Sequence, residues 1–344
     1  MKKLFVFLCV AGLIAASASP LFAGGIINKQ NQSTDYMRTL SRHAATDYAD
    51  IAVYNPAGIM KMEDGGYAKL DIMSFSKDYS NTVPSNFGEF DQAFGELSQD
   101  EPSIIPGFFA VFKQEKWAGF FAFTIPAGGG ELDYDKGDAR TVLLADGIAG
   151  GFNQQLEAGF GTNLFNYTRI DSQKIEVKES TVYGFTFGGS YAINDMWSIA
   201  AGARYSTGTR EFDGTAVISA PLPNGVIPNP YTADINLEED ASGWAGILGV
   251  NFAPNDKLNT ALTYISNTKM DYDMEVKRDT VLPDGSLLSS KIGFPDGSKR
   301  RIDIPALLGF GISYKFLPQL KVDLNYTYYF EKDADIDTFE DEGD

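Results

Sequence analysis

Cysteine and histidine are almost missing from this chain, which has one of each in 344 residues. Cys9 lies inside an N-terminal apolar stretch, so the rest of the chain has no disulfide or thiol chemistry. His43 is the only histidine and the sequence has no Gly-x-Ser-x-Gly motif, so a nucleophile with an adjacent base is not expected. We therefore expect no enzyme, no cofactor and no metal site.

Long apolar runs are also missing after the first residues. None approaches the ~18 residues that an apolar helix needs to cross a bilayer. The formal net charge of -18 excludes nucleic acid as an expected partner, because phosphate binding needs a basic surface. A secreted β protein and a transmembrane β-barrel remain.

The N-terminus has the pattern of a secretory signal peptide. Lys2 and Lys3 precede an apolar stretch from Leu4 to Ala16, and small residues precede Gly24. We therefore expect residues 1–23 to be removed and the mature chain to lie outside the cytoplasm.

Strict alternation of apolar and polar residues predicts paired β-strands. Tyr183, Phe185 and Phe187 alternate with Gly184 and Thr186, and the pattern resumes after Asn194-Asp195. Similar hairpins are expected over 244–264 and 306–330, a weaker one over 103–125, and a lone strand over 67–79. This makes about nine strands, an odd number where bacterial barrels have an even one.

A soluble β-sandwich also alternates, so it remains the alternative. Aromatic residues at the strand ends, strands of ~10 residues, and short turns alternating with long loops favour the membrane barrel. The long loops are expected on the outer side, over residues 80–101, 127–175, 207–243 and 267–303. Such a protein would lie in the outer membrane of a Gram-negative bacterium, among lipid and lipopolysaccharide.

The segment before the first strand carries a more specific signal, ending in Asp50-Ile51-Ala52-Val53-Tyr54-Asn55-Pro56-Ala57-Gly58. It resembles the N-terminal hatch of the FadL-type family of outer-membrane transporters for long-chain fatty acids and aromatic hydrocarbons. Weaker matches include Pro106-Gly107-Phe108-Phe109 and Gly202-Ala203-Arg204-Tyr205.

The resemblance implies an all-β fold, an antiparallel transmembrane barrel of fourteen strands with an N-terminal plug over residues 24–65. It also implies a hydrophobic small-molecule substrate and insertion by the barrel-assembly machinery. The barrel would cover residues 66–330, followed by an acidic tail over 331–344 that we read as solvated. Because only about nine strands are counted, we expect a chain shortened on its C-terminal side.

Two loops offer apolar residues for substrate capture. Phe87, Phe90, Phe94 and Leu97 recur at helical spacing and predict either an apolar groove or a short helix on the barrel rim. The second loop would either bind substrate or pack on itself. Its candidate residues are Leu143, Leu144, Ile148 and Phe152.

Polar candidates lie in the lumen and the plug. Arg204 on the inward face could bind the carboxylate of a fatty acid, with Lys315 second, or it could pair with Asp323 or a plug carboxylate. In the plug, Pro56 restricts Asn55 and predicts a defined turn. The other plug candidates are Asp47 and Asp50, which could bind lumen cations, Ala57, and His43 as a packing residue.

Three functions are compatible with this pattern. The first is a passive, plug-gated channel for hydrophobic compounds such as long-chain fatty acids. The second is a structural or adhesive outer-membrane protein that binds a partner through its loops. A general porin is third, because an ordered plug would obstruct an open polar lumen.

Overall fold

The computed structural model describes residues 30–85, 87–128, 131–160, 166–220 and 230–336. The predicted signal peptide, the first residues of the predicted plug and residues 337–344 of the acidic tail lie outside these ranges. Among the described residues, none of the helices has the length and apolar character required to cross a membrane.

The described residues form one large antiparallel sheet, so the predicted all-β fold class is confirmed. Nine strands follow one another along it, which also agrees with the predicted strand count. They are β1 (Gly65–Val83), β2 (Gly95–Gln114), β3 (Trp117–Gly128), β5 (Arg169–Ala192), β6 (Trp197–Ser219), β7 (Tyr231–Asn255), β8 (Leu258–Ile265), β11 (Leu307–Leu317) and β12 (Leu320–Tyr329).

The sheet is strongly curved but not closed, since β1 and β12 do not pair with each other within the described ranges. Three further strands pair with strands in the middle of this path or with each other. These are β4 (Leu132–Tyr134) on β5, β9 (Asp271–Arg278) on β7, and β10 (Lys299–Arg301) on β9.

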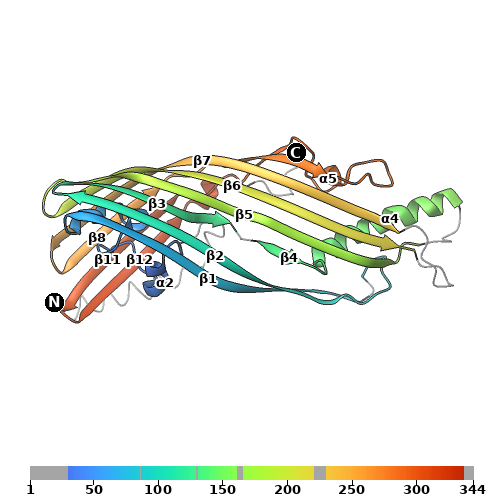
Figure 1. Cartoon of the computed structure of the whole chain (residues 1–344), viewed down its shortest axis with the longest axis horizontal. Coiled ribbons are helices and arrows are strands. Elements are labelled where there is room, and N and C mark those ends of the chain that lie inside the picture. The colour runs from blue at the N-terminus through green and yellow to red at the C-terminus, as the bar shows by residue number, and fades with distance from the viewer. Residues whose placement is uncertain (1–29, 86, 129–130, 161–165, 221–229, 337–344) are drawn as a thin grey trace.

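The two ends of the sheet differ. At one end, called here the plug end, short turns join β2 to β3, β5 to β6, β7 to β8, and β11 to β12. At the other end, called the loop end, lies the long helix α4 (Ala139–Phe160) (Figure 1). The predicted turns at 194–195, 254–256 and 318 all lie at the plug end.

Several residues predicted to be outer loops are strands. The hairpin of β6 and β7 remains paired from Trp197↔Phe252 to Ile218↔Tyr231, so most of the predicted loop 207–243 is wall. The reason is that inward and outward side chains continue to alternate beyond the apolar part of each strand, where the outward residues become charged. Since a strand crosses a bilayer in ~9–11 residues, these strands extend well beyond the membrane.

The outer face of β6 shows where the membrane lies. From Trp197 to Tyr205 its outward side chains are apolar or aromatic, over eight residue steps of ~3.3 Å or about 26 Å along the strand. Ring contacts mark both limits, with Trp197 at 4.3 Å from Phe252 and Tyr205 at 5.0 Å from Trp244. This band has the height expected of a lipid-facing belt between aromatic girdles.

Beyond the second girdle the outer face becomes charged. Lys178 on β5 binds Glu211 on β6 at 3.3 Å, and Arg278 on β9 binds Asp213 at 2.9 Å. These cross-strand ion pairs replace aromatic side chains at the level where the wall leaves the membrane belt, as expected for a surface in contact with water.

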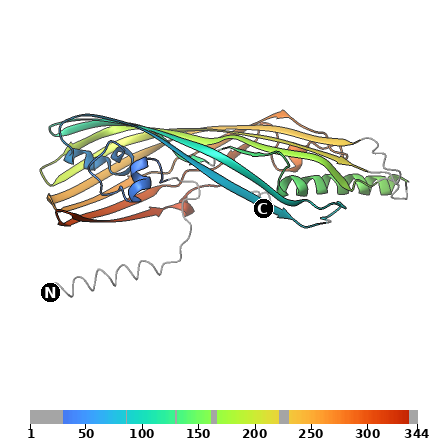
Figure 2. The same ribbon diagram turned by 60° about the horizontal axis from the view of Figure 1, so that its bottom comes forward.

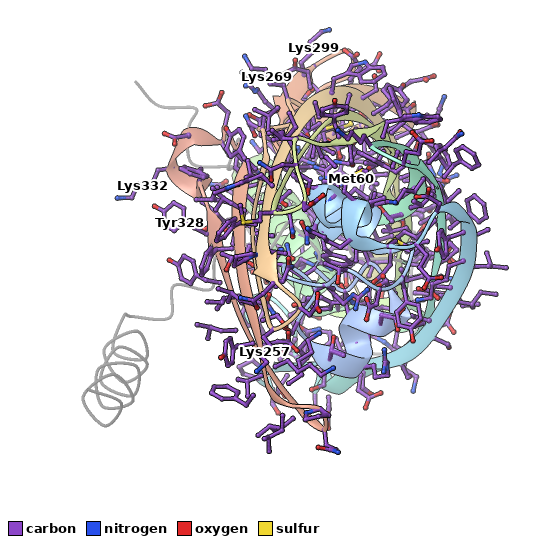
Figure 3. All side chains as sticks on the ribbon, turned by 90° about the vertical axis from the view of Figure 1, so that its left-hand side faces the viewer. Met60, Lys257, Lys269, Lys299, Tyr328 and Lys332 are labelled. Atoms are coloured by element: carbon purple, nitrogen blue, oxygen red, sulfur yellow. The ribbon has the colours of Figure 1, made fainter. Side chains whose placement is uncertain are left out.

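Residues 30–62 lie inside the curve of the sheet at the plug end (Figures 2 and 3). They form α2 (Thr34–Thr39), α3 (Ile51–Tyr54) and the 3-10 helix η1 (Pro56–Lys61), and β1 begins directly after them at Gly65. Met60 of η1 lies near the centre of the view from this end (Figure 3). A short 3-10 helix, η2 (Glu331–Asp333), follows β12.

The first residues of the predicted acidic tail are not simply solvated. Asp335 binds Arg301 at 2.9 Å, and Ile336 forms a β-bridge with Ile302. Both residues nevertheless remain exposed, so the solvated reading stands for them, with these two contacts to the preceding loop added.

Candidate functional site

Of the two alternatives predicted for the first outer loop, an apolar groove or a short helix, the helix is wrong, although the apolar residues of the loop do come together. Gly88 and Gly95 have φ angles of 58° and 68°, in the left-handed region that interrupts a right-handed helix. Between them the chain forms turns, and Leu97 belongs to β2. Phe90 nevertheless folds inward, is only 1% exposed, and contacts the Phe94 ring edge-on at 5.9 Å.

The second predicted loop contains a helix that sequence reasoning missed. Val142, Ala145 and Ala149 of α4 are fully buried at spacings of three and four residues. This helical periodicity was visible in the sequence, but Gly147, Gly150 and Gly151, within and directly after this stretch, obscured it. Of the apolar residues in that loop, Leu164 and Phe165 lie outside the described ranges.

Both loops contribute to one buried cluster at the loop end. The helix α4 packs there against the inner faces of β6 and β7, which contribute Ile218 and Ile235. The predicted residues that belong to this cluster or pack against it are Phe87, Phe90, Phe94, Leu97, Leu144, Ile148 and Phe152. The structure therefore unites seven of the eight apolar candidates.

The eighth candidate, Leu143, lines a cavity beside the cluster. This cavity has a volume of about 610 Å³ and lies between α4 and residues 282–292, which include α5 (Leu288–Lys291). Leu144 and Ile148 form part of its apolar wall, and Leu143 is 59% exposed there. A smaller cavity of about 70 Å³ continues between α4 and the inner faces of β6 and β7.

Two cations stand at the rim of the larger cavity. Arg140 binds Asp138 at 2.6 Å and borders both cavities, and Lys291 lies 3.6 Å from Asp284. Sequence reasoning missed these residues and the apolar wall opposite α4, formed by Leu282, Leu288 and Ile292. The apolar residues within the otherwise polar segment 267–303 were the available signal.

Between the cavities and the plug end, charged side chains lie on the inner faces of β6 and β7. Arg300 binds Glu239 at 2.7 Å, while Arg210 approaches the same carboxylate oxygen at 4.0 Å and lies 4.8 Å over the ring of Tyr272. Two guanidinium groups thus share one carboxylate. Arg210 is six residues from Arg204 on the same face of β6, a distance of ~20 Å along the strand.

Arg204 is buried on the inner face of β6, with 3% of its surface exposed. Its Nη2 donates one long hydrogen bond of 3.4 Å to Thr268 Oγ1, and its Nε has no hydrogen-bond partner among the described residues. The alternative that it pairs with Asp323 or a plug carboxylate is wrong within the described chain, because Asp323 binds Lys321 and the plug carboxylates bind other cations.

The Asn55-Pro56-Ala57 segment of the plug is fixed to three strands of the wall. Ser190 on β5 donates to the Pro56 carbonyl and Ser198 on β6 donates to the Ala57 carbonyl, each at 2.7 Å. Asn55 Nδ2 donates to Asn251 Oδ1 on β7 at 3.0 Å. Asn55 Oδ1 also accepts from the Gly58 N–H at 3.1 Å, which explains the ordered turn expected from Asn55-Pro56.

His43 fixes another part of the plug to β11 and β12. Its Nε2 lies 2.9 Å from Thr327 Oγ1, and its backbone N–H donates to Asn325 Oδ1 at 3.2 Å. A Cβ added to Gly309 would lie 2.5 Å from the imidazole, so the ring fills space left by that glycine. His43 is therefore a packing residue, as the sequence suggested.

The predicted role of Asp47 and Asp50 needs correction. Both bind Arg42 of the plug itself, at 2.8 Å and 2.5 Å, rather than a cation of the wall. Other carboxylates make the ion pairs to the wall, since Asp35 binds Lys69 of β1 at 2.5 Å and Asp64 binds Lys113 of β2. Because a plug arginine lies eight residues from Asp50, the local pair forms in place of a distant one.

Comparison with known proteins agrees with this architecture. The family model described as "Outer membrane protein transport protein (OMPP1/FadL/TodX)" matches residues 13–328. A Pseudomonas aeruginosa FadL homologue is similar in structure, with a TM-score of 0.53, 16% identity, and coverage of 88% of this chain and 69% of the other. The Ralstonia pickettii toluene transporter TbuX has a TM-score of 0.51, 15% identity, and coverage of 84% and 70%.

No curated protein matches the sequence. At these identities the two structures establish the fold, and the family match covers most of the chain. The chain therefore belongs to the OMPP1/FadL/TodX family, whose members are β-barrel transporters of hydrophobic compounds in the outer membrane of Gram-negative bacteria.

Proposed function

We propose that this protein is a passive, plug-gated channel for the uptake of hydrophobic compounds that carry a carboxylate, such as long-chain fatty acids. The observation that carries the proposal is Arg204, a buried guanidinium with no carboxylate partner in the described chain. Burying an unpaired charge costs several kcal/mol, and an anionic ligand would offset that cost. A neutral hydrocarbon would not.

The loop-end cavity supports the hydrophobic half of this substrate class. Its volume of about 610 Å³ lies within the range of sites for small molecules, and its wall is mostly apolar with a few polar groups at the rim. Leu143, Leu144 and Ile148 would contact the alkyl chain, while Arg140 and Lys291 lie where a headgroup would remain in water.

The inner face of β6 supplies a route from this cavity to the plug. Apolar side chains come first on this face, at Ile218, Ala216 and Phe212. Arg210 and Arg204 follow, and Ser198, which donates a hydrogen bond to the Ala57 carbonyl of the plug, comes last. A substrate would lose its alkyl contacts gradually as its headgroup moves between cations. Release of the substrate would require the plug to move away from the wall.

The adhesive alternative receives less support from the geometry. Phe90 and Ile148 face the interior of the loop-end cluster, so they offer an external partner little surface. As expected neighbours we retain lipopolysaccharide, against the charged outer face above the membrane belt, and the barrel-assembly machinery during insertion.

Uptake of a labelled long-chain fatty acid by cells lacking their own transporter tests the proposal. Arg204→Gln should lower uptake of the acid severalfold and leave uptake of the corresponding fatty alcohol unchanged. Leu143→Asp should lower both, because it places a charge in the apolar wall. Val281→Asp is a matched control, since Val281 is equally exposed but does not line the cavity. Equal effects of Arg204→Gln on acid and alcohol would reject a carboxylate site.

A further inference from the structure

The smaller of the two loop-end cavities, with a volume of about 70 Å³, adjoins the larger one of about 610 Å³. The two share four lining residues, Arg140, Leu144, Ile148 and Leu288. The larger cavity has the cations Arg140 and Lys291 at its rim, and the smaller one lies behind it, between α4 and the inner face of the wall. A ligand that enters the larger cavity therefore reaches the smaller one, called here the narrow pocket, with its far end.

Small residues on both sides create the narrow pocket. On the wall, Gly214 and Ala216 of β6 and Ala233 of β7 line it, and Ala216 lies directly opposite Ala233 in the strand register. On the helix, Ala145 lines it and is fully buried. None of these four side chains extends beyond a methyl group, so helix and sheet leave space between them. Voids larger than a water molecule are few in close-packed interiors, which makes this one a candidate for a ligand.

Larger apolar side chains limit the width of the narrow pocket. Ile175 of β5 and Ile235 of β7 pair with Gly214 from its two sides, and both are almost fully buried. Phe212 lines the pocket two positions further along β6. Buried side chains in a close-packed interior have little room to move aside. The pocket therefore has a defined width.

The volume of the narrow pocket restricts the shape of its occupant. A dry cavity of about 150 Å³ in a protein core holds a benzene ring, and the narrow pocket has about half of that volume. An aromatic ring is therefore too large for it. The end of a linear alkyl chain is only one methylene group wide and can enter.

We propose that the narrow pocket is a specificity pocket that accepts the end of a linear alkyl chain and excludes an aromatic ring. The inference rests on the proposed function and adds which hydrophobic acids the loop-end site prefers. The carboxylate lies at the rim near Arg140 and Lys291, the chain lies along the larger cavity, and its last carbons lie between Ala145 and Ala216. Each methylene group buried there tightens binding about fourfold.

Calorimetric titration of the full chain, held in amphipol instead of detergent, tests the narrow pocket. The ligands are tetradecanoate, 8-phenyloctanoate and octanoate. The first two have the same number of carbons, but one ends in a methyl group and the other in a ring. We expect tetradecanoate to bind about tenfold more tightly than 8-phenyloctanoate, because one to two more methylene groups are buried. Octanoate should occupy the larger cavity alone.

Filling the narrow pocket should weaken binding of the long linear acid only. Ala216→Leu should lower the affinity for tetradecanoate about tenfold and leave octanoate binding as in the parent, which also shows that the larger cavity is intact. Gly214→Ala is gentler, because a Cβ there would lie 3.4 Å from Ile235 and Phe212, an ordinary contact. It should weaken tetradecanoate binding about fourfold. Ala203→Leu adds the larger volume on the lipid-facing side of β6 and should change nothing.

Enlarging the narrow pocket should have the opposite effect. Phe212→Ala removes a ring from its wall and should make space for the phenyl group. The preference for tetradecanoate over 8-phenyloctanoate should then fall to about twofold or less.

Other outcomes would overturn the specificity pocket. Equal affinity of the parent for tetradecanoate and 8-phenyloctanoate would show that a ring is not excluded. An unchanged preference in Phe212→Ala would place the selection elsewhere. Equal losses for octanoate and tetradecanoate in both Ala216→Leu and Gly214→Ala would show that neither residue contacts the end of the chain. A parent that binds none of the three acids would instead contradict the proposed function itself.

Discussion

Asn55 of the plug and Asn251 of β7 are separated by 196 residues in sequence and joined by a hydrogen bond of 3.0 Å between two buried amides. The same Asn55 amide group donates to the Ala45 carbonyl and accepts from the Gly58 N–H. One side chain therefore organises the plug and fastens it to the wall.

Replacing Asn251 with alanine should loosen the plug. Asn55 loses one buried acceptor, and an unsatisfied buried polar group costs about 1–3 kcal/mol. Hydrogen exchange of residues 51–62 should become about tenfold faster or more, while exchange in β9 stays unchanged. Ser266→Ala is the control, since it removes a hydrogen bond at an exposed position. Unchanged exchange in the plug would mean that the contact contributes nothing to its seating.

Glycines of β11 should be essential for seating the plug. A Cβ on Gly311 would lie 2.4 Å from the Ala44 nitrogen and 2.5 Å from the His43 carbonyl carbon, so backbone must move. We expect Gly311→Ala to expose the plug to trypsin at Arg42. The matched change Gly119→Ala, on a strand with open space at that position, should leave cleavage as in the parent. Equal protection of both variants would contradict the tight fit.

Plug seating should weaken at acidic pH because of His43. Burial lowers the pKa of His43 below its ordinary value of about 6.5, and the contact with the Tyr54 carbonyl opposes this only in part. A released plug therefore binds a proton that the seated plug does not. Seating is fully stable above the ordinary pKa and weakens as the pH falls below it.

Hydrogen exchange of the plug, corrected for intrinsic rates, should accordingly rise between pH 7 and pH 5. His43→Gln removes the titrating group and should flatten this dependence. An equally steep dependence in that variant would assign the effect to another group.

The loop-end cluster should depend on Phe90. Truncating this buried ring to alanine leaves a cavity, with a cost of about 3–5 kcal/mol in well-packed cores. We expect α4 to lose protection against hydrogen exchange while the membrane belt keeps its own. Leu143→Ala, at an exposed position of the same helix, should leave α4 protected. Full protection of α4 without the Phe90 ring would show that the cluster is held by its other members.

Local patterns in the sequence were sufficient for much of the fold. The alternation of apolar and polar residues along β6 specifies which of its side chains face lipid and which face the interior. Aromatic residues such as Trp197 and Tyr205 mark the limits of the membrane belt. The short turns were recognisable for the same reason, because turn residues act within a few positions.

At the loop end, patterns over equally few residues predicted the wrong secondary structure. Phe87, Phe90, Phe94 and Leu97 have helical spacing, but Gly88 and Gly95 adopt left-handed backbone angles and prevent the helix. Charged residues on β6 and β7 resembled a polar loop, although cross-strand pairing kept them in the wall. In both cases a nonlocal contact or a backbone constraint outweighed the local preference.

The sequence by itself determined the strands, their two faces, the plug motif and the apolar character of the loops, since each follows from residues close together in the chain. Only the tertiary structure decided which partner each buried polar group finds. Asp50 binds Arg42 within the plug, Asn55 binds Asn251 of the wall, and Arg204 has no carboxylate partner in the described chain. The environments of Asn55 and Arg204 depend on strand register and on how the sheet curves around the plug, and no local pattern encodes them.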